Sequence, residues 1–126
     1  MLIRYASAVL SLAGTLALIL GLLFWAGAAL NLISMHMLLG FLAVGSLWVI
    51  AIGQFLSRNG SWTIALGAIL VGALSAVLGL YQSSLMIGDS HWIIQATHFF
   101  LGVLVIGLGH LGAARYRKSL ARSMSD

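Results

Sequence analysis

Residues 33–56 read ISMHMLLGFLAVGSLWVIAIGQFL, a run without a single charged side chain. A helix needs about 20 mostly apolar residues to cross the hydrocarbon core of a bilayer, and this run is long enough to do so. Three further stretches qualify in the same way, namely residues 5–30, 62–86 and 92–114. We therefore predict an integral membrane protein of the all-α class, with four helices embedded in a lipid bilayer.

The composition of the whole chain agrees with this prediction. Of 126 residues, 62% are hydrophobic and 6% are charged, whereas an average soluble domain has about 25% charged residues. So few polar groups cannot cover a soluble domain. The absence of Cys excludes disulfides, thiolate metal sites, iron–sulfur clusters and covalently attached c-type haem. The chain has no Glu, and its two Asp lie in a loop and at the terminus, which excludes mechanisms that need a carboxylate inside the membrane.

Short connections define the predicted arrangement of the four helices. They are centred on Asn31, residues 57–61 and residues 88–91. Connections this short force neighbouring helices to run antiparallel, which predicts an up-down-up-down bundle forming a single transmembrane domain over residues 1–126. The first helix exceeds the 7–15 apolar residues that are usual for a signal peptide, so we expect it to remain in the protein.

The basic residues predict the orientation of the bundle. All of them fall before the first span, between the second and third spans, or after the fourth: Arg4, Arg58, Arg115, Arg117, Lys118 and Arg122. The positive-inside rule then places both termini in the cytoplasm of a bacterium, with the chain crossing its cytoplasmic (inner) membrane several times. Basic residues in this pattern indicate membrane topology, and we expect no nucleic-acid partner.

The chain also repeats itself. Residues 36–45 read HMLLGFLAVG and residues 98–107 read HFFLGVLVIG, both of which fit H-x-x-L-G-x-L-x-[VI]-G. Residues 14–22 and 72–80 share a second pattern, G-x-L-x-x-x-L-G-L. Because the two matches occur in the same order, we predict that the bundle consists of two repeated helical hairpins. Halves with an even number of spans share one orientation and are related by an axis along the membrane normal.

The repeat places two histidines opposite one another. The predicted halves are residues 1–60 and 61–126, and their second helices are diagonal partners in the bundle. We therefore expect His36 and His98 to face each other in the outer third of the membrane. Polar residues inside a bilayer are costly and mark candidate functional sites, although a lone membrane His also serves as a packing contact between helices.

Two facing imidazoles predict axial ligation of a haem b iron, because a flat macrocycle fills the space between diagonal helices. Gly40 and Gly102 follow the two histidines by four residues, so each lies on the same helix face as its histidine and leaves a flat patch for the ring. Each Gly alone can equally serve close helix packing. Zinc fits less well, since it prefers four protein ligands. Iron with two imidazole ligands has no vacant position, so we expect electron transfer with a quinol or an extracytoplasmic redox partner.

The other two histidines are weaker candidates. His91 precedes His98 by seven residues at the outer boundary, where it is either a further contact to the cofactor or a solvated loop residue. The repeat counterpart of His110 is Trp48, so a second pair of haem ligands is not expected there. We predict instead that His110 hydrogen-bonds Gln54.

A four-helix bundle with His36 on its second span and His98 on its fourth resembles one half of the haem A synthase family. Members of that family consist of two such bundles, which hold haem between paired histidines near the outer face. The resemblance implies a cofactor-holding half. The catalytic half of the family has a Glu three residues before its histidine, where this chain has Ile33, so oxidation of a haem methyl group is not implied. Small membrane cytochromes of the b561 kind are also similar, but they use four histidines and two haems.

The sequence is also compatible with a function that needs no cofactor. The Gly-rich chain, with no catalytic groups outside the histidines, is also typical of a cofactor-free accessory subunit that packs against a larger membrane complex, or of a homo-oligomer. A small multidrug exporter fits less well, because its proton site usually needs an intramembrane carboxylate.

Overall fold

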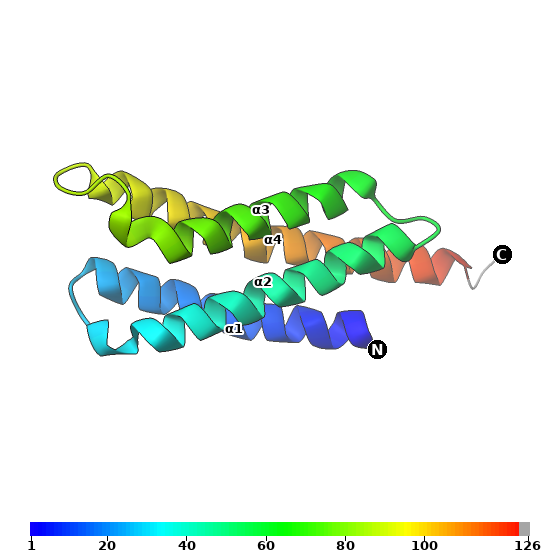
Figure 1. Cartoon of the computed structure of the whole chain (residues 1–126). Helices are drawn as coiled ribbons and strands as arrows, with labels where there is room; N and C mark the ends of the chain where they lie inside the picture. The colour runs from blue at the N-terminus through cyan, green and yellow to red at the C-terminus, as the bar shows by residue number, and fades with distance from the viewer. Residues whose placement is uncertain (124–126) are drawn as a thin grey trace.

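The computed structural model describes residues 1–123 of the chain. It consists of four long helices and two 3₁₀ turns: α1 (Leu2–Trp25), η1 (Leu30–Leu32), α2 (Ile33–Leu56), α3 (Trp62–Tyr81), η2 (Gln82–Ser84) and α4 (His91–Ser123). The helices run alternately up and down, so that the start of α1, the α2–α3 connection and the end of α4 lie at one end of the bundle (Figure 1). We call this the packed end, and the opposite end, with the α1–α2 and α3–α4 connections, the open end.

All four predicted spans are helical, and each is long and apolar enough to cross a membrane. The bounds of α2 are those predicted, whereas α1 and α3 end several residues early. In α1 the cause is a pair of left-handed residues, Gly27 (φ 74°) and Ala29 (φ 58°), which turn the chain into η1. After α3, Met86 (φ 48°) and Gly88 (φ 101°) reverse the chain in the same manner. Left-handed backbone breaks a right-handed helix regardless of how apolar the sequence is.

The diagonal relationship that was predicted for the second and fourth helices is present. α2 contacts α1, α3 and α4, whereas α1 and α3 make almost no contact with each other. The two hairpins pack against each other through α2 with α3, α1 with α4, and the diagonal contact of α2 with α4. This arrangement positions the one histidine-bearing helix of each hairpin toward the middle of the bundle.

The hydrophobic core occupies only part of the bundle. Leu10, Leu47 and Ile50 are its largest fully buried apolar side chains, and small residues such as Ala65 and Ala68 let the helices approach around them. All of these lie in the half of the bundle at the packed end. Close van der Waals packing of these side chains joins the four helices in this half.

The core stops at the same level in every helix. No residue is buried beyond Ala17 in α1, before Ala43 in α2, beyond Ser75 in α3 or before Val105 in α4. From this level to the open end the described helices enclose no packed apolar core. In Figure 1 the two hairpins spread apart toward this end.

At the packed end, the side chain of Gln54 links α2 to α4 and to the α2–α3 connection. Its Nε2 donates to the carbonyl oxygen of Gly112 (2.6 Å), and its Oε1 accepts from the backbone N–H of Ser61 (2.9 Å). The predicted hydrogen bond between Gln54 and His110 is therefore wrong. Gln54 is buried, whereas His110 lies on the exposed face of α4, where its Nε2 pairs with the Ser11 hydroxyl at 3.2 Å.

Candidate functional site

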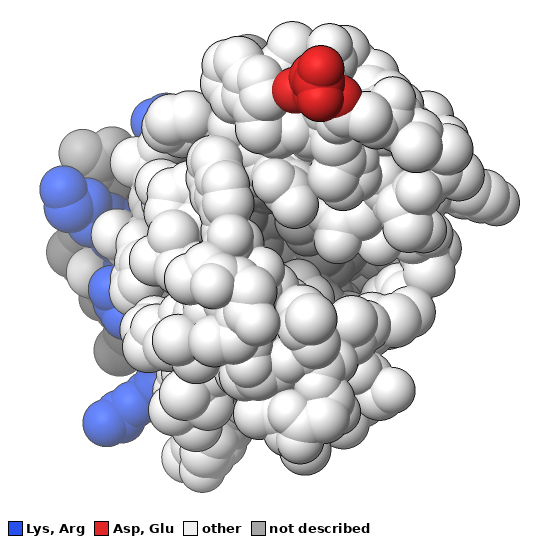
Figure 2. Space-filling model, turned by 90° about the vertical axis from the view of Figure 1, so that its left-hand side faces the viewer, with Lys and Arg blue, Asp and Glu red and all other residues white. Residues whose placement is uncertain are grey.

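The open half of the bundle contains a pocket between the two hairpins. All four helices contribute to its wall, and its volume is about 140 Å³, or about 1060 Å³ when the space open to solvent is counted. The residues at which the buried core stops, Ala17, Ala43, Ser75 and Val105, all line it. Figure 2 looks onto the open end and shows the surface hollowed there, with an acidic side chain above the hollow and basic side chains along the left-hand edge of the view. The only acidic residue in the described part is Asp89.

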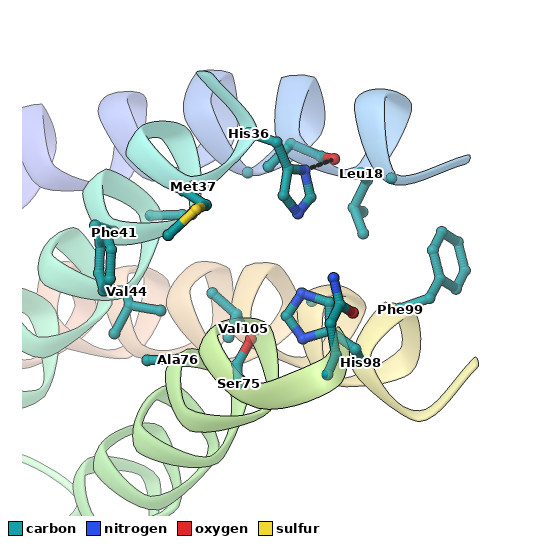
Figure 3. A pocket seen from close by; sticks show the side chains of 18 of the residues that line it. Leu18, His36, Met37, Phe41, Val44, Ser75, Ala76, His98, Phe99 and Val105 are labelled. Atoms are coloured by element: carbon teal, nitrogen blue, oxygen red, sulfur yellow. Dashed lines mark hydrogen bonds between the residues drawn. The ribbon is translucent and has the colours of Figure 1, made fainter. Parts of the chain in front are cut away.

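Two predicted site residues, His36 on α2 and His98 on α4, meet in this pocket. Their ring centroids are 6.2 Å apart, and their ring planes are inclined by 66°. Figure 3 shows the two rings projecting toward one another from opposite hairpins. The space between them is not filled by aliphatic side chains, in contrast to the level of Leu10 and Leu47 below.

A backbone hydrogen bond orients His36. Its Nδ1 lies 3.0 Å from the carbonyl oxygen of Ala17 on α1. A carbonyl only accepts, so Nδ1 carries the proton and Nε2 keeps its lone pair, facing away from this bond. Phe24 packs edge-on against the ring, with centroids 5.3 Å apart. Metal-binding histidines usually donate their second N–H to such a carbonyl, which fixes their tautomer and orientation.

His98 is the less satisfied member of the pair. Its Nδ1 is buried and has no hydrogen-bond partner among the residues that the structure describes. Buried polar atoms without a partner are rare in native proteins, and each one asks for a reason. The Nδ1 atom of His98 is therefore available to a further hydrogen-bond partner.

Two glycines that the sequence patterns did not assign to the site support the rings. A Cβ at Gly21 would lie 3.6 Å from Cε1 of His36, and a Cβ at Gly79 would lie 3.0 Å from Cε1 of His98. Each imidazole therefore rests where a neighbouring helix has no side chain. The sequence does contain a signal for this role, because Gly21 and Gly79 occupy the same position in the pattern that residues 14–22 and 72–80 share.

The two predicted glycines, Gly40 and Gly102, also line the pocket, but they differ in their surroundings. No atom lies within 4 Å of the position that a Cβ on Gly40 would take, so its backbone faces open space. At Gly102 the side chain of Leu18 lies 2.9 Å from that position. The flat patch expected beside each histidine is thus open next to His36 and covered by Leu18 next to His98.

The other two histidines lie elsewhere. His91 begins α4 and does not line the pocket; its Nδ1 pairs with the carbonyl oxygen of Leu85 at 3.1 Å in an exposed position. His110 is on the outer surface with Ser11. Of the four histidines, the structure brings together only His36 and His98.

The donor set limits what the pocket can bind. Within residues 1–123, no group of three or more His, Cys, Asp or Glu side chains is placed to hold a metal ion. A metal between His36 and His98 would receive two protein nitrogens on opposite sides and would need its remaining ligands from a cofactor. Two nitrogen–metal bonds of about 2 Å, plus roughly 1 Å from each nitrogen to its ring centre, give a separation of about 6 Å. The observed 6.2 Å fits such an arrangement.

The chain matches no protein-family model, and it has no significant match among curated proteins or solved structures. Its function is therefore inferred from the residues of the pocket.

Proposed function

We propose that the protein is a small membrane b-type cytochrome, which holds one haem b between His36 and His98 and transfers electrons. The observation that carries this proposal is the pair of imidazoles, 6.2 Å apart, in a part of the bundle that has no apolar core. When bound, haem with two imidazole ligands supplies a one-electron couple without an open position for oxygen.

The pocket has the surfaces that such a cofactor needs. Its wall is mainly apolar, with Leu18, Met37, Phe41 and Phe99 around the two histidines (Figure 3). A flat, apolar ring placed between the hairpins would restore the burial that the open half lacks. The backbone at Gly40 gives one face a side-chain-free approach.

The polar edge of a haem would lie toward the open end. No described Lys or Arg lines the pocket, so its carboxylates cannot be held by ion pairs there. Besides the histidines, three residues that line the pocket carry a side-chain N–H donor, namely Trp25 at the end of α1, Gln82 in η2 and Gln95 near the start of α4. We assign to the two glutamine amides the role of hydrogen-bonding the carboxylates near water.

A duplicated hairpin explains why the two halves of the site are alike. In the first half, His36 packs over Gly21, one helical turn after Ala17; in the second, His98 packs over Gly79, one turn after Ser75. The same arrangement thus recurs at equivalent positions of the two shared sequence patterns. This supports the origin of the site by repetition of one hairpin.

The proposed location is the bacterial cytoplasmic membrane. The basic residues at the start of α1, between α2 and α3 and in α4 would lie in the cytoplasm with both termini. The open end and its pocket would then face outward. A quinol in the bilayer or an extracytoplasmic protein would be the electron partner.

The experiment is an absorption spectrum of the detergent-purified protein, oxidised and then reduced with dithionite. We expect a low-spin b-type spectrum with about one haem per chain. His36→Ala and His98→Ala should abolish it, and His110→Ala should leave it intact as the matched control. A protein that stays colourless after haem is supplied would contradict the proposal.

An accessory subunit without a cofactor is the second candidate. It is favoured by Gly45 on α2 and Gly107 on α4, which are exposed and have no atom within 4 Å of the position that a Cβ would take. Small residues on outer faces let a further helix approach closely. Purification of a colourless protein in a stable complex with a larger membrane protein would favour this candidate.

A further inference from the structure

We propose that the hydroxyl of Ser75 orients His98 for iron, by accepting a hydrogen bond from the Nδ1–H of that ring. Ser75 would thereby do for His98 what the Ala17 carbonyl does for His36. This inference rests on the proposed haem site and adds a positioning residue to it.

The hydrogen bond that orients His36 in the first hairpin indicates how His98 is oriented in the second. His36 lies over Gly21, and its Nδ1 reaches the acceptor provided by Ala17, the residue one turn earlier on the same face of α1. In the second half, His98 lies over Gly79 on α3, with Cε1, Nε2 and Nδ1 at 3.0, 3.5 and 3.9 Å from the Cβ position. The residue one turn before Gly79 is Ser75, which lines the same pocket (Figure 3).

The hydroxyl oxygen of Ser75 can also accept a hydrogen bond. Four polar side chains are buried in the described part of the chain: Gln54, Ser61, Ser75 and Ser119. Hydrogen bonds engage the other three, whereas the Ser75 hydroxyl makes none within residues 1–123. The unpartnered Nδ1 of His98 and the unpartnered hydroxyl of Ser75 thus line one pocket, and Ser75 lies one helical turn before Gly79, over which the His98 ring rests.

Pairing the two groups satisfies both. A neutral imidazole has one N–H and one lone pair, so donation from Nδ1 to the Ser75 oxygen leaves Nε2 as the iron ligand. The hydroxyl proton can in turn be donated to the carbonyl four residues earlier, a common habit of serine in helices. An acceptor on the second nitrogen makes an imidazole a stronger electron donor, which favours ferric over ferrous iron.

The test compares Ser75→Ala and Ser75→Thr in the haem-loaded protein, with Ser46→Ala, outside the pocket, as the control. We expect Ser75→Ala to weaken the preference for ferric iron about tenfold, which raises the midpoint potential by about 59 mV for a one-electron couple. Ser75→Thr, which keeps the hydroxyl, and Ser46→Ala should stay near the unmodified protein. An unchanged potential in Ser75→Ala overturns the proposal, and so does an equal rise in Ser75→Thr, which would indicate packing alone.

A second measurement separates this inference from the proposed function. Nitrogen-15 NMR of the haem-free protein reports which ring nitrogen of each histidine is protonated. We expect Nδ1–H at both rings, with Ser75→Ala altering His98 and leaving His36 unchanged. A His98 ring that carries its proton on Nε2 in the unmodified protein would refute the Ser75 hydrogen bond, whether or not haem binds. Absence of haem binding alone refutes only the proposed function.

Discussion

The Nδ1 atom of His36 lies 3.0 Å from the carbonyl oxygen of Ala17 on the adjacent helix, and this contact decides which ring nitrogen is left to face the pocket. The ring also lies over Gly21, one turn later on α1, where a Cβ would be in contact with Cε1 at 3.6 Å. A small residue and a histidine on neighbouring helices therefore act together. The same contact occurs between Gly79 and His98, and the first prediction follows from it.

A methyl group at position 79 should disturb the site. In Gly79→Ala the new Cβ would lie 3.0 Å from Cε1 of His98, closer than ordinary packing allows, so the ring has to move. We expect haem affinity to fall about 10-fold to 100-fold, as for loss of other groups that orient metal-binding histidines. Titration of haem into the haem-free protein measures this.

The matched control is Gly67→Ala, on the same helix. No atom lies within 4 Å of its Cβ position, so the substitution should leave haem affinity unchanged. It should also favour the helix by roughly 0.5–1 kcal/mol, because Gly is the more flexible residue in the chain before folding. Equal haem affinities in the two variants would show that Gly79 does not support the ring.

Gln54 should matter for stability and not for the pocket. Its side chain bonds Gly112 and Ser61 in the packed half, away from His36 and His98. Gln54→Leu keeps a similar volume but leaves the buried N–H of Ser61 without this acceptor, so the free energy of unfolding should fall by about 1–3 kcal/mol.

Chemical or thermal unfolding of the haem-free protein in detergent checks the effect of Gln54→Leu. The control, also in the haem-free protein, is Gln82→Leu at the open end, where no side-chain hydrogen bond is lost. A Gln54→Leu protein as stable as the control would mean that the bonds of Gln54 contribute nothing measurable. Both variants should keep the positions of His36 and His98.

Sequence patterns predicted the parts of the structure that depend on polarity along the chain. The ends of α2 were predictable because Asn31 and Ser57–Arg58 interrupt an otherwise apolar run. The end of α1 was not, since residues 26–30 are mostly apolar and the helix is broken by the backbone conformations of Gly27 and Ala29. Such conformations depend on how the hairpin closes.

The candidate site was likewise predictable from the sequence only in part. The repeat predicted that His36 and His98 share a depth and a side of the bundle, and the structure brings them together. The pairing of Gln54 with His110 was predicted from depth alone, which does not specify a helix face. At 3.6 residues per turn, His110 and Gly112 point about 160° apart on α4, and it is Gly112 that faces α2. The roles of Gly21 and Gly79 depend on contacts between helices, which no single stretch of sequence contains.

Membrane orientation gives a prediction that is independent of any cofactor. The chain has no Cys, so single substitutions provide unique labelling sites. With both termini in the cytoplasm, Asp89→Cys should react with a membrane-impermeant maleimide in intact cells. Asn59→Cys, in the α2–α3 connection, should react only after the membrane is permeabilised. The opposite pattern would place the open end and its pocket in the cytoplasm.

Haem binding should stabilise the two halves of the bundle unequally. The packed half has Leu10, Leu47 and Ile50 as its core, whereas the open half has no buried residue in the described helices beyond Ala17 or Ser75. A ligand that binds only the folded state adds stability according to its concentration and affinity, and this stability is largest where the ligand makes its contacts. Removal of haem should therefore speed amide hydrogen exchange in the open half while the packed half keeps its protection. Exchange followed by mass spectrometry, with and without haem, measures the difference. A uniform change along all four helices, or none, would mean that the ring does not fill the space between the hairpins.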